Sequence, residues 1–260
     1  MATLIPAATQ TQAHLTEIFA SVQGEGPWVG ERQLFVRFLG CNLDCLYCDA
    51  PETKTRQSRC RIEEEPGSWR FMWVDNPFTV ADLMRHLERF GSPALYHAVA
   101  VTGGEPLLHH RFLAKWFPAL RQAGYRVYLE TSGELRAKME RVASWVDFCA
   151  MDIKLPSSSG EKPLWQAHRA FLQVCRDAGI ATYAKAVVGH NSTDEEIEES
   201  ARIVAEVWNE VTLVLQPVTP FGAVTQAPTA AQMLRFQQIA LTIHPRVRVI
   251  PQTHKLLGAL

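Results

Sequence analysis

Three cysteines lie close together in the segment Cys41-Asn42-Leu43-Asp44-Cys45-Leu46-Tyr47-Cys48. Intervals of four and three residues allow one loop to place three thiolates around a single 4Fe–4S cluster, which leaves the fourth iron open to an exogenous ligand. An open iron on a reducible cluster can bind a small molecule and transfer an electron to it. The alternative interpretation is a zinc site, in which Cys60 or a histidine supplies a fourth ligand.

Three further groups of polar residues follow predicted strands. They are Thr102-Gly103-Gly104-Glu105-Pro106, Glu130-Thr131-Ser132-Gly133 and Asp152-Ile153-Lys154. Because the carboxyl ends of parallel strands meet at one edge of a sheet, we expect these groups to face a common site there. The simpler interpretations are an ordinary turn for the glycine-rich segment and surface strand-end charges for Asp152 and Lys154.

The rest of the chain alternates short apolar runs with helical patterns, and this alternation predicts the elements that position those residues. The predicted strands are Leu34–Leu39, Ala98–Val101, Arg126–Leu129, Phe148–Ile153, Thr182–Val188, Val211–Leu215 and Val247–Ile250. The predicted helices are Val80–Arg89, Phe112–Ala123, Gly133–Ala143, Leu164–Ala178, Asp194–Trp208 and Ala230–Ile243. Such alternation predicts a parallel sheet, open or closed into a partial barrel. Residues 52–77 break the pattern and are predicted to form an insertion within one domain spanning residues 1–260.

The composition is that of an ordinary globular protein, with 47% hydrophobic and 20% charged residues. A net charge of −1 argues against a broad electrostatic surface for nucleic acid. The apolar runs are shorter than the ~20 residues of a membrane span, and the N-terminus lacks the pattern of a secretion signal. We therefore expect a cytoplasmic protein with reduced thiols, Cys149 and Cys175 lying in the core and Cys60 in a loop.

The cysteine loop, with Tyr47 before its third cysteine, and the Gly-Gly-Glu-Pro segment resemble the radical S-adenosylmethionine (SAM) superfamily. The resemblance implies a partial (β/α)6 barrel of the TIM type, with a 4Fe–4S cluster on Cys41, Cys45 and Cys48. In that superfamily the open iron binds SAM, and reduction yields a 5′-deoxyadenosyl radical. The residues implied to bind SAM are Tyr47, Asp49, Gly103, Gly104, Glu105, Ser132, Asp152, Lys154 and Gln216.

Residues 17–26, which read Glu-Ile-Phe-Ala-Ser-Val-Gln-Gly-Glu-Gly, and the terminal Gln252-Thr253-His254-Lys255 resemble the 7-carboxy-7-deazaguanine synthase family. That family converts 6-carboxy-5,6,7,8-tetrahydropterin to a 7-deazapurine by ring contraction with loss of ammonia, on the route to queuosine. The resemblance implies substrate contacts by Val22, Gln23, Gly24, Glu25, Arg37, Thr102 and His254. The planar fork of Arg37 would hold the substrate carboxylate, and Glu25 would accept hydrogen bonds from ring nitrogens and the amine.

Simpler roles stay open for several of these residues. Arg37 could be an ion-paired strand residue, Gln23 and Glu25 could form a mere turn, and His254 could be a solvated residue of the tail. Two other functions also fit the cysteine loop: an activase that generates a glycyl radical on a large partner enzyme, and a non-catalytic zinc or iron–sulfur module. The combination of Glu25, Arg37 and His254 favours a small-molecule substrate.

One position departs from the family pattern. The family has a hydroxyl residue after the Cys-Asp pair that supplies a ligand to Mg²⁺, whereas this chain has Ala50, whose methyl group cannot bind a hard cation. Thr53 or Asp49 could take its place, Mg²⁺ could be dispensable, or the chain could belong to a divergent branch with an altered substrate. The resemblance further implies a homodimer and a flavodoxin or ferredoxin as the electron donor.

Overall fold

The computed structural model describes residues 12–259, so the residues at the N-terminus that lack a secretion pattern lie largely outside the described part. The strands are β1 (Gln12–Ala13), β2 (Leu15–Val22), β3 (Arg32–Phe38), β4 (Arg59–Glu63), β5 (Phe71–Asp75), β6 (Phe78–Thr79), β7 (Ala98–Gly103), β8 (Val127–Thr131), β9 (Phe148–Ile153), β10 (Ala181–Val188), β11 (Thr212–Pro217) and β12 (Val247–Val249). The α-helices are α1 (Val80–Glu88), α2 (His110–Gln122), α3 (Arg136–Met139), α4 (Pro156–Ser159), α5 (Trp165–Asp177), α6 (Asp194–Trp208), α7 (Ala230–Leu241) and α8 (Thr253–Leu257). Short 3-10 helices are η1 (Gly26–Trp28), η2 (Pro51–Lys54), η3 (Pro93–Leu95), η4 (Pro106–His109) and η5 (Ala143–Trp145).

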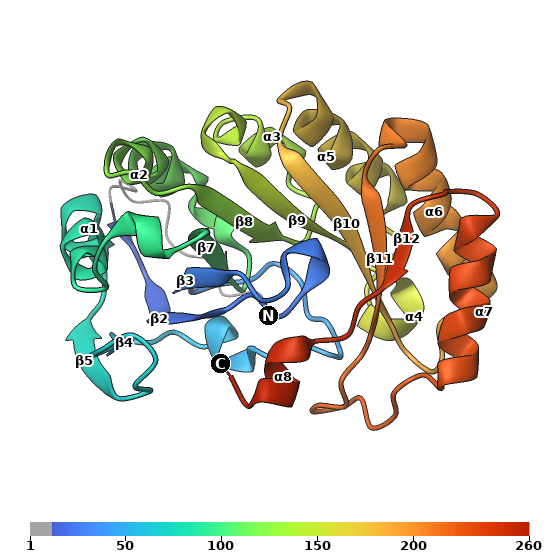
Figure 1. Ribbon diagram of the computed structural model, residues 1–260, viewed down its shortest axis with the longest axis horizontal. Helices are drawn as coiled ribbons and strands as arrows, with labels where there is room; N and C mark the ends of the chain where they lie inside the picture. The colour runs from blue at the N-terminus through green and yellow to red at the C-terminus, as the bar shows by residue number, and fades with distance from the viewer. Residues whose placement is uncertain (1–11, 260) are drawn as a thin grey trace.

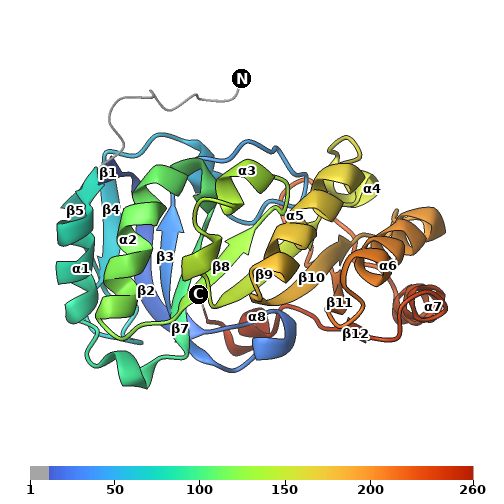
Figure 2. The same ribbon diagram turned by 90° about the horizontal axis from the view of Figure 1, so that it is seen from above.

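A curved ten-stranded sheet with the order β12-β11-β10-β9-β8-β7-β3-β2-β4-β5 forms the centre of the molecule (Figure 1). From β3 through β7 to β12 neighbouring strands run parallel, whereas β2 is antiparallel to β3. The larger helices cover the convex side in Figure 1 and lie side by side over the sheet in Figure 2. This arrangement confirms the predicted α/β fold, an open, partial barrel of the TIM type.

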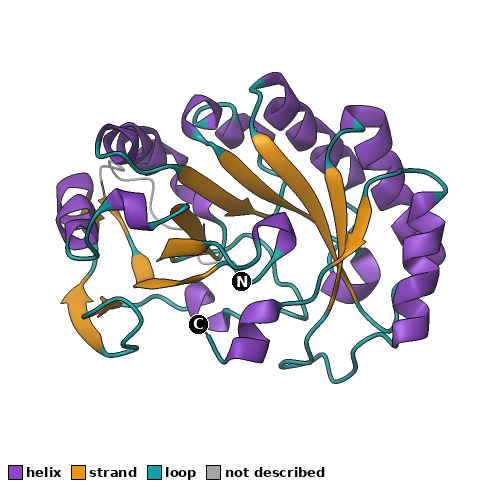
Figure 3. Ribbon diagram, in the orientation of Figure 1, coloured by secondary structure: helices purple, strands orange, loops and turns teal. Residues whose placement is uncertain are grey.

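Local sequence signals account for most of these elements. The helix predicted over Asp194–Trp208 has the predicted bounds, because Thr193 and Glu196 form a capping box at its start. The helix predicted over 133–143 is reduced to α3 and η5. The strand β2 was not predicted, and Figure 3 shows it as part of the same sheet. Within residues 12–259, no helix is long and apolar enough to cross a membrane.

The period-two alternation of the strands divides the apolar core into two parts. Side chains on the convex face pack against the helices, where Trp116 and Phe171 are fully buried. Full burial of each such side chain stabilises the fold by about 1.5–3 kcal/mol. A smaller cluster lies on the concave face, where the ring of Trp28 approaches that of Tyr128 with 5.5 Å between centroids. Cys149 and Cys175 are fully buried in the core, as predicted.

Residues 52–77 contain η2 and the β4–β5 hairpin, which extends the sheet beyond β2. The prediction of Cys60 as a loop thiol was wrong. Cys60 lies in β4 and its side chain is fully buried. The error arose because β4 gains its pairing partner, β2, from a segment more than 40 residues earlier in the chain, and the local sequence does not show this partner.

Candidate active site

Six neighbouring parallel strands each contribute one polar residue to the site, in the same arrangement. On each strand from β3 and β7 to β11, a residue of the concave cluster is followed two positions later by a polar residue that lines a cavity. The pairs are Phe35 and Arg37, Ala100 and Thr102, Tyr128 and Glu130, Ala150 and Asp152, Tyr183 and Lys185, and Val214 and Gln216. Both members of a pair face the concave side, because residues two apart on a strand share a face. The result is a ring of polar groups above an apolar floor.

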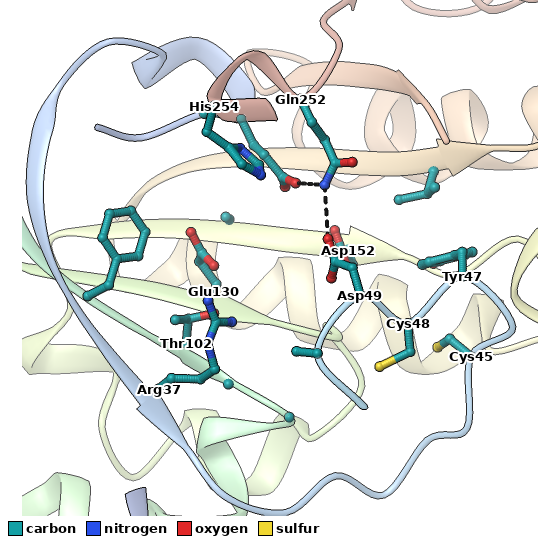
Figure 4. A pocket seen from close by; sticks show the side chains of 18 of the residues that line it. Arg37, Cys45, Tyr47, Cys48, Asp49, Thr102, Glu130, Asp152, Gln252 and His254 are labelled. Atoms are coloured by element: carbon teal, nitrogen blue, oxygen red, sulfur yellow. Dashed lines mark hydrogen bonds between the residues drawn. The ribbon is translucent and has the colours of Figure 1, made fainter. Parts of the chain in front are cut away.

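The cavity has a volume of about 580 Å³, within the range of small-molecule sites. The C-terminal segment forms one of its walls, as Figure 4 shows. Gln252 Nε2 donates to Glu25 Oε1 at 2.7 Å and lies 3.3 Å from Asp49 Oδ2. The Thr253 N–H donates to the Gly24 carbonyl at 2.8 Å. This segment therefore joins the loop after β2 to the loop that carries the cysteines.

His254 lines the cavity and packs on Gly24, so it is not a solvated tail residue. A Cβ atom on Gly24 would lie 2.0 Å from His254 Nδ1, which is a steric clash. Only glycine, which has no Cβ, therefore fits at this position. Burial lowers the pKa of the His254 imidazole. The neighbouring Gln23 and Glu25 also line the cavity, as do Val22 and Thr102. The structure thus brings together every residue predicted to contact the substrate.

The cysteine loop is positioned by close backbone packing between strand ends. It leaves β3 through Gly40, whose φ of 99° favours glycine. A Cβ on Gly103 would lie 2.2 Å from the Phe38 carbonyl oxygen, and one on Gly104 would lie 2.2 Å from that of Gly40. The Gly-Gly pair therefore allows the end of β7 to lie directly against the start of the cysteine loop.

Cys41, Cys45 and Cys48 all line the cavity. Burial raises the pKa of the Cys41 thiol to about 11 and also raises the pKa of Cys45. Thiolates at these positions require a nearby cation, and the iron of a cluster supplies one. The donor set and its exposure to the cavity therefore fit a cluster with an open iron.

The zinc alternative is less consistent with the structure. In the part of the chain that is described, no group of three or more His, Cys, Asp and Glu side chains is placed to hold a single metal ion. Cys60, the candidate fourth ligand, is fully buried in β4 and is not among the residues that line the cavity with the three cysteines. A closed zinc site needs four ligands in a tetrahedron, and Cys60 does not complete one.

Two buried polar atoms of the cavity wall have no hydrogen-bond partner among residues 12–259: the Tyr47 hydroxyl and Gln216 Oε1. Such atoms are costly to leave unsatisfied, so they fit a bound polar ligand. Beside them, Lys154 Nζ lies 2.7 Å from Asp152 Oδ2 and 5.4 Å from the centre of the Tyr47 ring. Asp49, Gly103, Gly104 and Ser132 also line the cavity. This part of the wall suits the predicted SAM site.

Two charged residues of the ring, Glu130 and Lys185, were not predicted to bind SAM or substrate, although Glu130 belongs to one of the strand-end groups expected to face the site. Lys185 pairs with Glu25, and its Nζ lies 3.1 Å from Asp152 Oδ1. Burial alone would lower the pKa of Lys185, but the two carboxylates hold it well above its ordinary value. Glu130 accepts a hydrogen bond from Gln23 at 3.0 Å, and burial raises its pKa. The sequence signal for both was a charged residue two positions after a tyrosine in an apolar strand.

Arg37 combines the two roles that its sequence context left open. Its Nε donates to Glu17 Oε1 at 2.7 Å, so it is an ion-paired strand residue. It also lines the cavity, beside Thr102 and Glu130 in Figure 4. Burial alone would lower the pKa of Arg37, but Glu17 raises it, so the guanidinium stays charged. A charged, partly buried guanidinium in a cavity wall suits an anionic ligand.

Comparison with known proteins identifies the family of this chain. The model of the radical SAM superfamily matches residues 35–204. Over 251 residues the chain is 43% identical to the 7-carboxy-7-deazaguanine synthase of Geobacter sulfurreducens, which covers 95% of this chain and 98% of that relative. The chain belongs to the 7-carboxy-7-deazaguanine synthase family. It is therefore a radical SAM enzyme, and a 4Fe–4S cluster and SAM are its cofactors.

A second relative supports the assignment to this family, and a solved structure supports the fold. The chain is 31% identical to the 7-carboxy-7-deazaguanine synthase of Methanocaldococcus jannaschii over 253 residues, which covers 95% of this chain and all of that relative. Its fold is similar to the crystal structure of QueE from Escherichia coli, with a TM-score of 0.60 at 21% identity over 94% of this chain and 95% of the other.

Glu105, which the resemblance implied as a SAM contact, is not among the residues that line the cavity of this synthase-family enzyme. Its side chain is fully buried. The carboxylate accepts hydrogen bonds from the Ser132 N–H and hydroxyl at 2.8 Å, and from the Thr131 hydroxyl at 3.0 Å. Burial raises the pKa of Glu105. Glu105 therefore orders the turn that carries Ser132, because a buried carboxylate needs such donors.

Thr53 is not available as a substitute Mg²⁺ ligand. It is fully buried in η2, and its hydroxyl donates to the Ala50 carbonyl at 2.6 Å. Ala50 itself lines the cavity, and its sequence neighbours Asp49 and Glu52 supply carboxylates to the same wall. The residues at this corner therefore do not form the hydroxyl-containing Mg²⁺ site of the family.

Proposed function

We propose that this enzyme converts 6-carboxy-5,6,7,8-tetrahydropterin to 7-carboxy-7-deazaguanine with loss of ammonia, a step toward queuosine and related 7-deazapurines. One observation carries the proposal. A single cavity holds the three cysteines together with Glu25, Arg37 and His254, which come from three distant segments of the chain. The names of the relatives in Geobacter and Methanocaldococcus agree with it.

The two ends of the cavity bind different ligands. At the cysteine end, Tyr47, Asp152, Lys154 and Gln216 hold SAM, and the bound cluster and SAM supply the radical that abstracts hydrogen from the substrate. At the other end, Arg37 holds the substrate carboxylate. The apolar floor and the C-terminal segment exclude water, which strengthens each polar contact and fixes the orientation of the substrate.

Glu25 recognises the pterin ring in this proposal. Its Oε1 accepts hydrogen bonds from the side-chain amides of Gln216 at 3.1 Å and Gln252 at 2.7 Å. A pterin amine and ring nitrogen can replace such donors, because a carboxylate accepts from donor pairs. Lys185 pairs with the other oxygen of this carboxylate, Oε2, which leaves Oε1 to accept from the ligand.

The direct test is anaerobic incubation of the reconstituted enzyme with 6-carboxytetrahydropterin, SAM and reductant, with the products identified by mass spectrometry. Formation of 7-carboxy-7-deazaguanine is expected. An activase would instead transfer the radical to a partner protein, and a non-catalytic module would leave SAM intact under dithionite. The cavity of about 580 Å³, with Glu25, Arg37 and His254 in its wall, favours a small substrate.

Replacing Arg37 with alanine is expected to weaken binding of the carboxylated pterin by about 2–5 kcal/mol, the scale for truncating one partner of a buried charged pair. SAM cleavage without substrate should persist, because Arg37 lies away from the cysteine end. Equilibrium binding of pterin and of SAM measures both effects. Equal losses of the two affinities would make Arg37 a structural residue.

The Ala50 substitution leads to a prediction about Mg²⁺. Magnesium keeps several waters and takes only one or two protein ligands, so losing the hydroxyl ligand weakens the metal site. Turnover should therefore survive EDTA better than in relatives that require Mg²⁺, and Ala50→Thr should increase stimulation by added Mg²⁺. Thr53→Ala should not change the metal response, since its hydroxyl is bonded to Ala50. An EDTA-sensitive wild type whose metal response is lost in Thr53→Ala would contradict this prediction.

The electron donor in this proposal is a flavodoxin or ferredoxin, because the cluster must be reduced before SAM is cleaved. We further propose that the enzyme is a homodimer, by resemblance to its family, and that it works in the cytoplasm, where thiols stay reduced. Size-exclusion chromatography with light scattering tests the dimer. Comparing turnover with each donor protein tests the reductant.

A further inference from the structure

Three charged residues form a row across three neighbouring strands at one wall of the cavity. Glu17 on β2 lies opposite Arg37 on β3 and opposite Arg61 on β4. Glu17 Oε1 accepts from Arg37 Nε at 2.7 Å, and Oε2 accepts from Arg61 Nε at 2.6 Å. All three residues line the cavity, and the Glu17 side chain is only 5% exposed. The carboxylate is thus shared between two guanidinium groups, one oxygen to each.

This division leaves the substrate-facing end of Arg37 free. Among residues 12–259, the Arg37 side chain makes one hydrogen bond, from Nε to Glu17. The two terminal nitrogens, Nη1 and Nη2, have no hydrogen-bond partner among these residues. An arginine and a carboxylate otherwise prefer two parallel hydrogen bonds, one from each of two nitrogens. If Oε2 of Glu17 were unoccupied, it could take a terminal nitrogen of Arg37 in this way. Arg61 prevents this second hydrogen bond because it already occupies Oε2.

The β4–β5 hairpin holds Arg61 firmly in this place. Arg61 lies over the ring of Phe71 on β5, with 4.7 Å from Cζ to the ring centre. Glu63, two residues later on β4, accepts hydrogen bonds from the Ala20 and Trp69 N–H groups, both at 2.9 Å. The hairpin is thereby fixed to β2, the strand that carries Glu17. It is therefore part of the active-site wall.

We propose that Arg61 is a positioning residue, which holds the second oxygen of Glu17 and so reserves the terminal nitrogens of Arg37 for the carboxylate of the substrate. The row of two arginines and one glutamate carries a net charge of +1, and the carboxylates of Glu130 and Asp49 also act electrostatically on Arg37. This inference rests on the proposed function only in taking the ligand to be a carboxylated pterin. It gives residues 52–77 a role in substrate recognition.

The test uses binding of 6-carboxypterin, a stable ligand whose fluorescence reports its affinity without turnover. Arg61→Gln should weaken binding about tenfold or more, because a freed Glu17 would compete for Arg37 and a charge-assisted hydrogen bond is worth roughly a factor of ten. The double variant Glu17→Gln, Arg61→Gln should recover most of the affinity, since the competing carboxylate is gone. Arg61→Lys should stay close to wild type. Pterin without the carboxylate should bind all variants equally.

Arg59→Gln is the matched control, because Arg59 lies on the same strand but pairs with Asp75 outside the cavity. It should leave the affinity unchanged. A double variant as weak as Arg61→Gln would overturn the proposal and indicate that Arg61 contacts the ligand directly. An equal loss for pterin without the carboxylate would make Arg61 structural, and no binding by the wild type would also overturn it. Wild type that shows the predicted binding pattern but no 7-carboxy-7-deazaguanine would overturn the proposed function alone.

Discussion

Replacing any one of Cys41, Cys45 and Cys48 with alanine is expected to abolish both the brown absorbance of the 4Fe–4S cluster and the cleavage of SAM. Each cysteine supplies one of the three protein thiolates, and the fourth iron is left for SAM, so no spare ligand is present to compensate. All three side chains line the same cavity, which agrees with a shared cluster. Absorbance after anaerobic reconstitution and 5′-deoxyadenosine release under dithionite measure the two effects.

Cys60→Ala is the matched control for these variants. Its thiol is fully buried in β4, where it acts as a small apolar side chain, and burial raises its pKa. The variant should keep the cluster and SAM cleavage and should lose only about 1 kcal/mol of unfolding free energy, the scale for a small buried deletion. Loss of the cluster in Cys60→Ala would show instead that four thiolates bind it.

Replacing Lys185 with methionine is expected to destabilise the fold by about 3–5 kcal/mol, because it removes the cation between two buried carboxylates. The Lys185 side chain is 11% exposed and pairs with Glu25 and Asp152, which are 18% and 20% exposed. Methionine fills a similar volume but leaves these carboxylates without their shared partner. SAM and pterin binding should also fall, since both carboxylates line the cavity.

The same variant should change the pH dependence of stability. Burial alone would raise the pKa of Asp152, but Lys154 and Lys185 lower it. A carboxylate with a lowered pKa in the folded state adds stability above its unfolded pKa of about 3.9, and this stability is lost as the pH falls through the folded value. Without Lys185 the pKa of Asp152 should rise. The unfolding free energy of the variant should therefore fall furthest below that of wild type at neutral pH, and the difference should shrink in mild acid.

Urea unfolding at neutral and mildly acidic pH measures this difference. Lys162→Met, at an exposed position outside the cavity, is the control and should change the unfolding free energy little at either pH. The role given to Lys185 would be contradicted if Lys185→Met had the same unfolding free energy as wild type, or if the difference between them grew in acid.

The sequence by itself determined the features that depend on neighbouring residues. The intervals between Cys41, Cys45 and Cys48 indicated a cluster with an open iron. The apolar runs and their spacing predicted the parallel strands, and the acid-rich start of α6 predicted its bounds. Placement of the polar segments at strand ends predicted a common site, because parallel strands present their carboxyl ends at one edge.

Only the tertiary structure decided which distant residues share that edge. Lys185 meets Glu25 from 160 positions away, and Arg61 reaches Glu17 only because β4 pairs with β2. Glu105, adjacent to the Gly-Gly pair, turns inward to bind Ser132. Local pattern cannot specify such contacts, because a strand's alternation gives two faces but does not say which partners cover each one. The curvature of the sheet and the pairing of its strands determine that.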